Sequence, residues 1–265
     1  MYMHFGKEAS AYSKYRNDLP GDLFASLKQR GVTFQNAVTV DIGAGTGVLS
    51  RALAREGAVV TGVEPSAELL NEAEKMQRQA GTSLFYASGS AEELPAADDY
   101  ADIITVMRAW HWFDRDKALQ EISRVLRPDG HLLVMDAGFQ TGTDIVEKTI
   151  TFLKERLPEA SVSPAGAKAE STQRILGFPV EWFEEWQSHH LALKELYSLD
   201  YTVSFTNTEW CGRISSISWL VSQEEEVRTN VMEELAEMLV SEYPGAVHNI
   251  PHTCSVAMLR KPITK

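Results

Sequence analysis

The sequence predicts an α/β fold in which helices cover both faces of a doubly wound parallel sheet. Between Val38 and Met135, short apolar runs alternate with amphipathic segments, which is the order typical of that fold. The first apolar run leads into the glycine-rich turn GAGTG at 43–47, and the second ends on a glutamate. Glycines between a strand and a helix let the backbone approach a ligand closely, so a ligand site is expected at this turn.

The apolar runs predict strands at 38–42, 58–63, 83–87, 102–107 and 131–136. Apolar residues at helical spacing follow the first, second and fourth of these strands, and RPDG at 127–130 is expected to end the last helix. Upstream of this core, residues 6–30 are expected to form one or two helices with a break at Pro20–Gly21.

After Asp136 the pattern loosens, and helical stretches take the place of the next strand. We expect an extended segment over 190–205, a helix that begins near Thr206 or Asn207, a longer amphipathic helix after it, and a final strand at 253–261. The chain is therefore predicted to be one domain over 1–265. Its parts are a helical lid (1–34), a core (35–140), a helical cap insertion (142–190), and a C-terminal part of the sheet with helices (191–265).

The composition of the chain disfavours several classes of partner and site. The 37 acidic residues outnumber the 25 basic ones, and the resulting net charge of −12 disfavours a nucleic-acid partner. Cys211 and Cys254 are far apart with no CxxC neighbour, which argues against a disulfide framework or a zinc site. No apolar stretch suits a signal peptide or a membrane span, so a cytoplasmic protein that does not enter a membrane is expected.

The spacing of the glycines distinguishes between nucleotide-like ligands. A dinucleotide fingerprint requires GxGxxG, but Val48 stands where the third glycine would be, and the pattern is GxGxG instead. Asp41, at the head of the turn, would oppose the pyrophosphate of a nicotinamide cofactor and favour an amine. A nicotinamide oxidoreductase is thus disfavoured.

At these residues the sequence resembles the class I S-adenosylmethionine-dependent methyltransferases. Their first motif is matched by VDIGAGTG at 40–47, the acidic strand end by TGVEPS, and the following loop by GSAEELPA at 89–96. The segment from Met107 to Val134, MRAWHWFDRDKALQEISRVLRPDGHLLV, is similar to the branch that includes small-molecule enzymes such as trans-aconitate methyltransferase. The resemblance covers residues 35–140 and implies a Rossmann-like, seven-stranded sheet.

The resemblance also implies a set of residues that bind S-adenosyl-L-methionine, or its product S-adenosyl-L-homocysteine. Glu64 would accept hydrogen bonds from both ribose hydroxyls, Ser90 and Ala91 would contact adenine, and Tyr12 and Arg16 would lie at the methionine end. Arg108 would face either the cofactor or an anionic substrate. The full predicted set is Tyr12, Arg16, Asp41, Gly43, Ala44, Gly45, Glu64, Pro65, Ser90, Ala91 and Arg108.

His111 is the one candidate for catalysis, as a general base, with a structural or cofactor-side role as the alternative. Its neighbours Trp110, Trp112 and Phe113 would line a pocket or pack in the core. Trp182, Phe183 and Trp186 are expected to make the acceptor pocket apolar. Four further histidines have no metal-ligand spacing and are interpreted as surface or core residues: His189, His190, His248 and His252.

The sequence thus predicts methyl transfer to an O, N or C nucleophile on a small-molecule acceptor. A small carboxylic acid is one acceptor that Arg108 and Arg16 would suit. The alternative is a protein that binds S-adenosylmethionine or S-adenosylhomocysteine without transferring methyl groups. No metal is expected.

Overall fold

A computed structural model of the chain describes residues 18–157, 166–221 and 223–263. Its main sheet has seven strands in the order β3-β2-β1-β4-β5-β9-β8. The first five strands are parallel, whereas β9 runs antiparallel to both β5 and β8. The bounds are β1 (Val38–Ile42), β2 (Val59–Glu64), β3 (Phe85–Ser88), β4 (Ala101–Met107), β5 (Leu126–Phe139), β8 (Ala192–Thr206) and β9 (Val247–Arg260). The predicted doubly wound sheet is confirmed.

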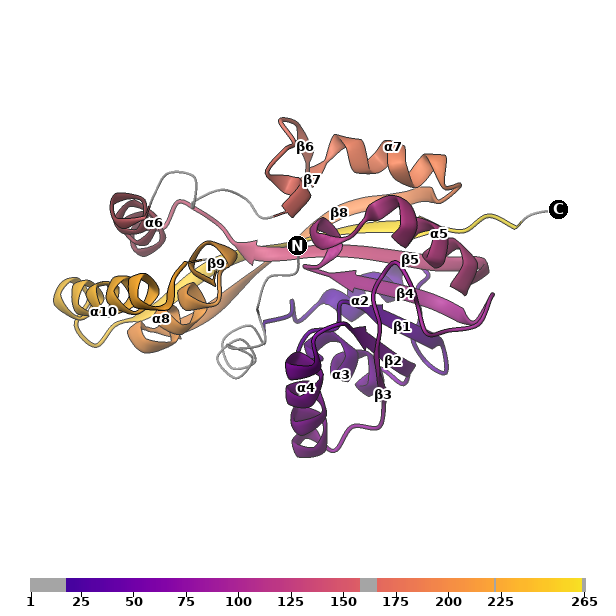
Figure 1. Cartoon of the computed structure of the whole chain (residues 1–265), viewed down its shortest axis with the longest axis horizontal. Coiled ribbons are helices and arrows are strands. Elements are labelled where there is room, and N and C mark those ends of the chain that lie inside the picture. The colour runs from indigo at the N-terminus through magenta and orange to yellow at the C-terminus, as the bar shows by residue number, and fades with distance from the viewer. Residues whose placement is uncertain (1–17, 158–165, 222, 264–265) are drawn as a thin grey trace.

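Helices cover both faces of this sheet, and a separate group packs at the far end of its longest strands (Figure 1). One face carries α2 (Leu23–Gln29), α3 (Val48–Arg55) and α4 (Ala67–Ala80). The opposite face carries α5 (Arg115–Val125) and α7 (Val180–Ser188). The far group contains α6 (Asp144–Arg156), α8 (Asn207–Ser215) and α10 (Glu225–Glu242), with the short α9 (Ser218–Val221) after α8. Minor elements are the 3₁₀ helices η2 (Trp110–Trp112) and η4 (Gly166–Lys168) and the hairpin of β6 (Arg174–Ile175) and β7 (Phe178–Pro179).

Side-chain caps fix where several helices begin. The Ser66 hydroxyl accepts from the Leu69 N–H at the start of α4, and Asp114 does the same for Lys117 at the start of α5. Thr206 and Glu209 form a reciprocal capping box on α8, at the position that the sequence predicts. The helix α5 ends at Val125, and Asp129 (φ 69°) makes the turn of the RPDG segment.

Three hydrophobic clusters hold these layers together. One joins α2 and α3 to the sheet, a second joins α5 and α7 to the opposite face, and the third lies within the α6, α8 and α10 group. The segment 142–190, expected as one helical cap, is divided between them, because α6 packs with α8 and α10 whereas α7 packs on the core.

This division changes the interpretation of the tryptophans. Trp182 and Trp186 are each 1% exposed and pack around Trp110, at ring-centroid distances of 6.4 and 6.0 Å. They are core residues in this structure, so the expectation that both line an acceptor pocket is wrong. Phe183 is partly buried against the same cluster, with its ring 5.1 Å from that of Trp186.

The strands β5, β8 and β9 are longer than the rest and extend past the carboxyl ends of β1 and β4. Registers pair Phe139 with His252 and Thr206 with Val247, so the distal halves of these strands form the platform for α6, α8 and α10. Within the described ranges, no helix is both long enough and apolar enough to cross a membrane.

Candidate cofactor-binding site

The glycine turn joins β1 to α3 at the carboxyl edge of the sheet. The N–H groups of Gly43 and Ala44 donate to the Val63 carbonyl, at 2.9 and 3.1 Å. The Gly45 N–H donates to Glu64 Oε2 at 3.0 Å. Since these three donors are bound to β2, the turn does not direct them at a phosphate, which agrees with the sequence argument against a dinucleotide.

Two of the glycines are required by what packs against them. A Cβ on Gly43 (φ 68°) would lie 2.5 Å from the Ala109 Cβ, and a Cβ on Gly47 (φ 74°) would lie 1.8 Å from the Tyr86 hydroxyl. The turn is therefore pressed onto the residues that follow β4 on one side and onto Tyr86 of β3 on the other.

Glu64, the last residue of β2, is the best-placed ligand group of this edge. Its side chain accepts from the Gly45 N–H through Oε2 and from the Ser66 N–H through Oε1, at 3.0 and 3.1 Å. The residue is 7% exposed, and burial raises the pKa of its carboxyl while the two N–H groups oppose that shift. Each oxygen keeps a second lone pair, so the carboxylate is held rigidly with capacity for two more donors. Pro65, which follows it, is exposed.

Asp41 is a buried carboxyl that two side-chain hydroxyls bind. Its Oδ2 accepts from the Ser50 hydroxyl at 2.5 Å and its Oδ1 from the Thr105 hydroxyl at 2.8 Å. At 2% exposure, burial raises the pKa of Asp41 to about 6, against the effect of those hydroxyls. Asp41 thus joins β1 to α3 and β4, and each of its oxygens keeps a second lone pair. Its role toward an ammonium group stays a prediction.

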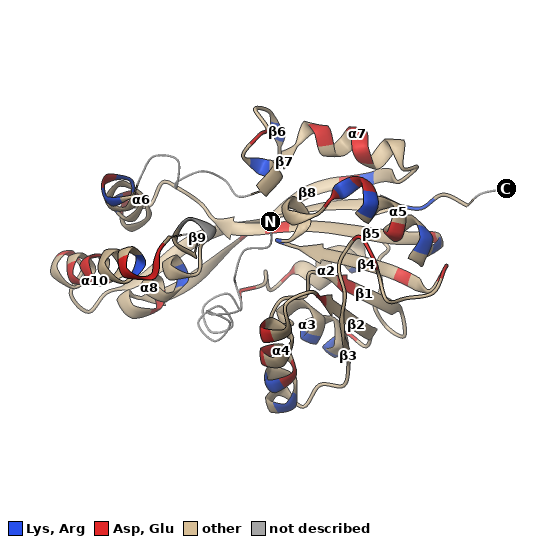
Figure 2. Ribbon diagram, viewed as in Figure 1, with Lys and Arg blue, Asp and Glu red and all other residues tan. Residues whose placement is uncertain are grey.

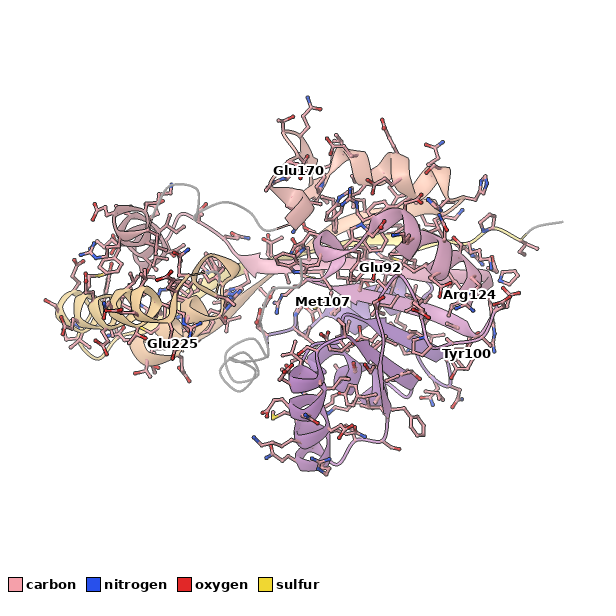
Figure 3. The ribbon with its side chains drawn as sticks, in the orientation of Figure 1. Glu92, Tyr100, Met107, Arg124, Glu170 and Glu225 are labelled. Atoms are coloured by element: carbon pink, nitrogen blue, oxygen red, sulfur yellow. The ribbon has the colours of Figure 1, made fainter. Side chains whose placement is uncertain are left out.

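The loop after β3 is fixed beside Glu64 and against α5. The Gly89 N–H lies 3.4 Å from the Glu64 carbonyl, which brings Ser90 to the same edge of the sheet. Ala91, the next residue, is 3% exposed. Arg124 of α5 donates to the Ala96 carbonyl at 2.8 Å, and Figure 3 shows Glu92 and Arg124 on the side of the sheet that α5 covers. The predicted adenine-contacting residues therefore lie in a rigid loop next to the ribose candidate.

Arg108 turns away from the glycine turn toward the long strands. Its backbone has a left-handed conformation (φ 58°), and its guanidinium donates to the Ala137 carbonyl at 2.8 Å and to Asp18 Oδ2 at 2.6 Å. The Tyr201 hydroxyl also donates to Asp18 Oδ2, at 2.8 Å. Arg108 accordingly joins β4, β5, β8 and the segment before α2, contacts that no sequence pattern indicates.

His111 lies in η2 and is covered by η4. A Cβ added to Gly166 would lie 2.2 Å from the His111 carbonyl oxygen, so the two 3₁₀ helices are in direct contact. Next to Gly166 in η4, Lys168 forms an ion pair with Asp136 of β5. Burial opposes ionisation of Asp136, but the charges of Lys168, His111 and Arg108 hold its pKa below the usual range. Lys168 and Asp136 are site neighbours that sequence reasoning missed. The catalytic role of His111 stays a prediction.

Two predicted residues, Tyr12 and Arg16, lie outside the described residues. In the ranges that the structure describes, no group of histidine, cysteine and carboxylate side chains is arranged to hold a metal ion.

Residues 40–134 match the family model described as a methyltransferase domain. An uncharacterized methyltransferase of Mycobacterium bovis is 35% identical over 132 residues, which are 50% of this chain and 51% of that protein. A ubiquinone/menaquinone biosynthesis C-methyltransferase of Vibrio vulnificus is 38% identical over 104 residues, which are 37% of this chain and 40% of that protein. The chain thus spans about half the length, or less, of the curated relatives it matches.

Solved structures extend the likeness of the fold to most of the chain. The YcgJ protein of Bacillus subtilis has a TM-score of 0.55 at 21% identity and covers 90% of this chain and 97% of its own. A SAM-dependent methyltransferase of Aquifex aeolicus has a TM-score of 0.50 at 14% identity, over 70% and 90% of the two chains. Residues 40–134 are thus similar to a methyltransferase domain, and the solved structures show that the likeness of the fold continues beyond them.

Proposed function

We propose that this protein transfers a methyl group from S-adenosylmethionine to a small-molecule acceptor. The observation that supports it most is Glu64, a buried carboxylate fixed by two backbone N–H groups at the sheet edge that the glycine turn forms. S-adenosylmethionine supplies an electrophilic methyl group when it is bound, and the protein has to bind it, align the acceptor and exclude water.

Glu64 would accept the ribose hydroxyls, since a carboxylate with two occupied and two open lone-pair positions suits a vicinal diol. Ser90 and Ala91 would contact the adenine, because their loop is fixed to α5 and lies beside Glu64. Gly43, Ala44 and Gly45 would contribute a close backbone surface rather than N–H donors, as those donors are bound to β2. Pro65, Tyr12 and Arg16 stay in the proposed set on the resemblance alone.

Three observations bear on the acceptor. Acidic and basic residues are interspersed over α4 and over the α6, α8 and α10 group rather than gathered into a basic stripe, and the net charge is −12 (Figure 2). That charge distribution disfavours a polynucleotide acceptor. The proposed role of Arg108 as a ligand for a small carboxylic acid meets competition from Asp18, which already binds its guanidinium.

The test is calorimetric titration with S-adenosylhomocysteine. We expect the wild type to bind it, and Glu64→Ala to bind it roughly 10- to 150-fold more weakly, because a hydrogen bond to a charged group contributes about 1.5–3 kcal/mol. Glu74→Ala is the matched control, since Glu74 is the same residue type on α4, the helix that follows β2, but has a 52% exposed side chain and only a loose ion pair with Arg78.

Thermal unfolding of the unliganded Glu64→Ala variant tells a lost ligand contact from a lost fold, because the substitution also frees the Gly45 and Ser66 N–H groups. Absence of binding by the folded wild type would refute the proposal. If the wild type binds but no extracted metabolite takes up label from S-adenosylmethionine carrying a radioactive methyl group, the non-catalytic binding protein becomes the better reading.

A further inference from the structure

A cluster of buried polar side chains lies between the long strands and the segment before α2. We call it the His252 cluster; its members come from β8, β9, α8, the residue after β4 and the chain before α2, and they are Asp18, Arg108, Tyr201, Arg213 and His252. His252 is fully buried, Arg213 is 3% exposed, and the Asp18 side chain is 5% exposed. Polar groups this deep are expected to be hydrogen-bonded.

Hydrogen bonds and ring contacts connect the members of the cluster. Arg108 and Tyr201 both bind Asp18 Oδ2, and the Tyr201 ring lies 5.3 Å from the His252 ring. The ring of Phe139 lies 6.3 Å from that of His252, and the Arg213 guanidinium carbon lies 5.5 Å from the centre of the same Phe139 ring. The charges of Arg108 and Arg213 both act on Asp18 and on His252.

The hydrogen bond of His252 fixes which ring nitrogen carries the proton. Nδ1 lies 2.9 Å from the Ile250 carbonyl oxygen, which can only accept, so Nδ1 is the donor. Burial lowers the pKa of His252, which keeps the ring neutral near pH 7. Nε2 of the neutral ring is therefore a bare lone pair, and it has no hydrogen-bond partner in the described part of the chain.

Asp18 adds a second acceptor of the same kind. Its Oδ2 is bound by Arg108 and Tyr201, whereas its Oδ1 is buried and has no partner among the described residues. Although burial opposes it, the charges of Arg108 and Arg213 hold the pKa of Asp18 below its ordinary value, so the carboxyl is ionised and can only accept. Two buried acceptors of one cluster, linked through Tyr201 and both without donors among the described residues, call for a hydrogen-bond donor from elsewhere.

The cluster is also adjacent to the proposed cofactor edge. Ala109, the residue after Arg108, is the one against which the Gly43 turn is pressed. Arg108 reaches the cluster from a left-handed backbone conformation, which a non-glycine residue adopts at an energetic cost and which is concentrated at functional sites. One peptide bond therefore separates a residue that touches the glycine turn from a residue that binds Asp18.

We propose that the His252 cluster binds the methyl acceptor by an amino group, or by two hydroxyl groups, which donate hydrogen bonds to His252 Nε2 and Asp18 Oδ1. This inference rests on the proposed methyl transfer and adds the acceptor's chemical class and location to it. A molecule with only carbonyl or carboxylate oxygens would leave both acceptors unsatisfied and would be selected against.

The test is nuclear magnetic resonance of protein labelled with ¹⁵N in its histidine rings, with His248 as an internal control on the same strand. The Asn207 amide nitrogen donates to the Leu239 and Tyr243 carbonyls, so its oxygen faces His248 Nε2 at 2.7 Å and makes that nitrogen a donor. We expect opposite tautomers: the Nδ1–H form at His252 and the Nε2–H form at His248. The Nε2–H form at His252 would overturn the proposal.

The second measurement adds probes of known chemistry, ethanolamine and ethylene glycol as hydrogen-bond donors and acetate as a molecule that only accepts. We expect the two donors to give a saturable shift of the His252 Nε2 signal that is absent at His248, and acetate to give none. Equal shifts at both histidines, no shift at all, or a hydrogen-bond coupling from His252 Nε2 to a donor of the protein itself would each refute the assignment.

Titration of His252→Phe with S-adenosylhomocysteine keeps this inference separate from the proposed function. We expect the His252→Phe variant to bind S-adenosylhomocysteine as the wild type does. Ethanolamine should raise the thermal unfolding temperature of the wild type but not that of this variant, whereas His248→Phe should show both responses. If neither wild type nor variant binds S-adenosylhomocysteine, the methyl-transfer proposal fails and the histidine measurements still decide the donor site.

Discussion

Replacing Asp41 by asparagine should change how the stability of the protein depends on pH. The wild-type carboxyl is 2% exposed, and its pKa is raised from 3.8 to about 6, with burial as the largest cause. Since the folded-state pKa lies above the unfolded one, folding favours the protonated form. The stabilisation is complete below pH 3.8 and is lost as the pH rises through about 6.

The size of this effect follows from the two pKa values. The interval between 3.8 and about 6 corresponds to about 3 kcal/mol of unfolding free energy over the whole window, and about half of that is lost between pH 5 and pH 8. Asparagine has the same shape, keeps an oxygen for the Thr105 hydroxyl and carries no ionisable group. The variant should therefore gain roughly 1.5 kcal/mol of stability relative to the wild type between pH 5 and pH 8.

Urea unfolding of both proteins at a series of pH values measures this difference directly. Asp98→Asn is the control, because Asp98 is a carboxylate with a 77% exposed side chain. A difference between Asp41→Asn and the wild type that stays constant with pH would refute the assignment of Asp41 as a buried structural carboxyl. Repeating the series with bound S-adenosylhomocysteine tests the ammonium role, since a salt bridge to the ligand would hold Asp41 ionised and reverse the trend.

Two further substitutions test the packing described above. Gly47→Ala should destabilise the fold by about 1–3 kcal/mol because the residue has φ 74° and its Cβ would overlap the Tyr86 hydroxyl, and thermal unfolding should show part of the loss recovered in the double variant with Tyr86→Phe. No recovery would mean that backbone strain alone accounts for the glycine. Trp182→Ala should lower the free energy of unfolding by about 3–5 kcal/mol, measured in urea, because the ring is 1% exposed and packs between Trp110 and Trp186. The folded variant should keep its affinity for S-adenosylhomocysteine. A loss near zero would mean that Trp182 lines a pocket instead.

The sequence carries the information on the cofactor edge because that information is local. The strand at 38–42 coincides with β1, and the glycines, Glu64 and the 89–96 loop each lie at a strand end, as a parallel sheet requires. Periodicity also placed the helix that begins after Thr206, whose capping box is contained within four residues.

Contacts between distant segments were not predictable in the same way. Asp41 is bound by Ser50 and Thr105, and Thr105 is 64 residues away, so its role as a buried structural carboxyl depends on the folded sheet. Arg108 and Asp18 are 90 residues apart, and nothing in the sequence around Arg108 indicates that its side chain would bind Asp18. Likewise, the cap segment could not be assigned to two clusters before the positions of α6 and α7 were known.

His252 lies between these two cases. The sequence predicts either a core or a surface residue at this position, and the full burial of His252 shows that it is a core residue. A signal was present in the alternation along β9, where His248, Ile250, His252 and Cys254 occupy every second position and are all buried. What the alternation could not supply is the identity of the facing residues, which come from β8 and from the segment before α2.

The position of β8 at the edge of the sheet bears on how the protein resists aggregation. Within the described ranges β8 pairs on one side only, with β9, and a straight border strand of this length would be a template for the addition of a foreign strand. The register shifts between Leu193 and Glu195, so Lys194 forms a bulge that bends the border and places a charge there. Glu195 next to it is engaged with Arg30, 2.7 Å away. The bulge and its charges are thus devices that protect the border of a long strand against the addition of another chain.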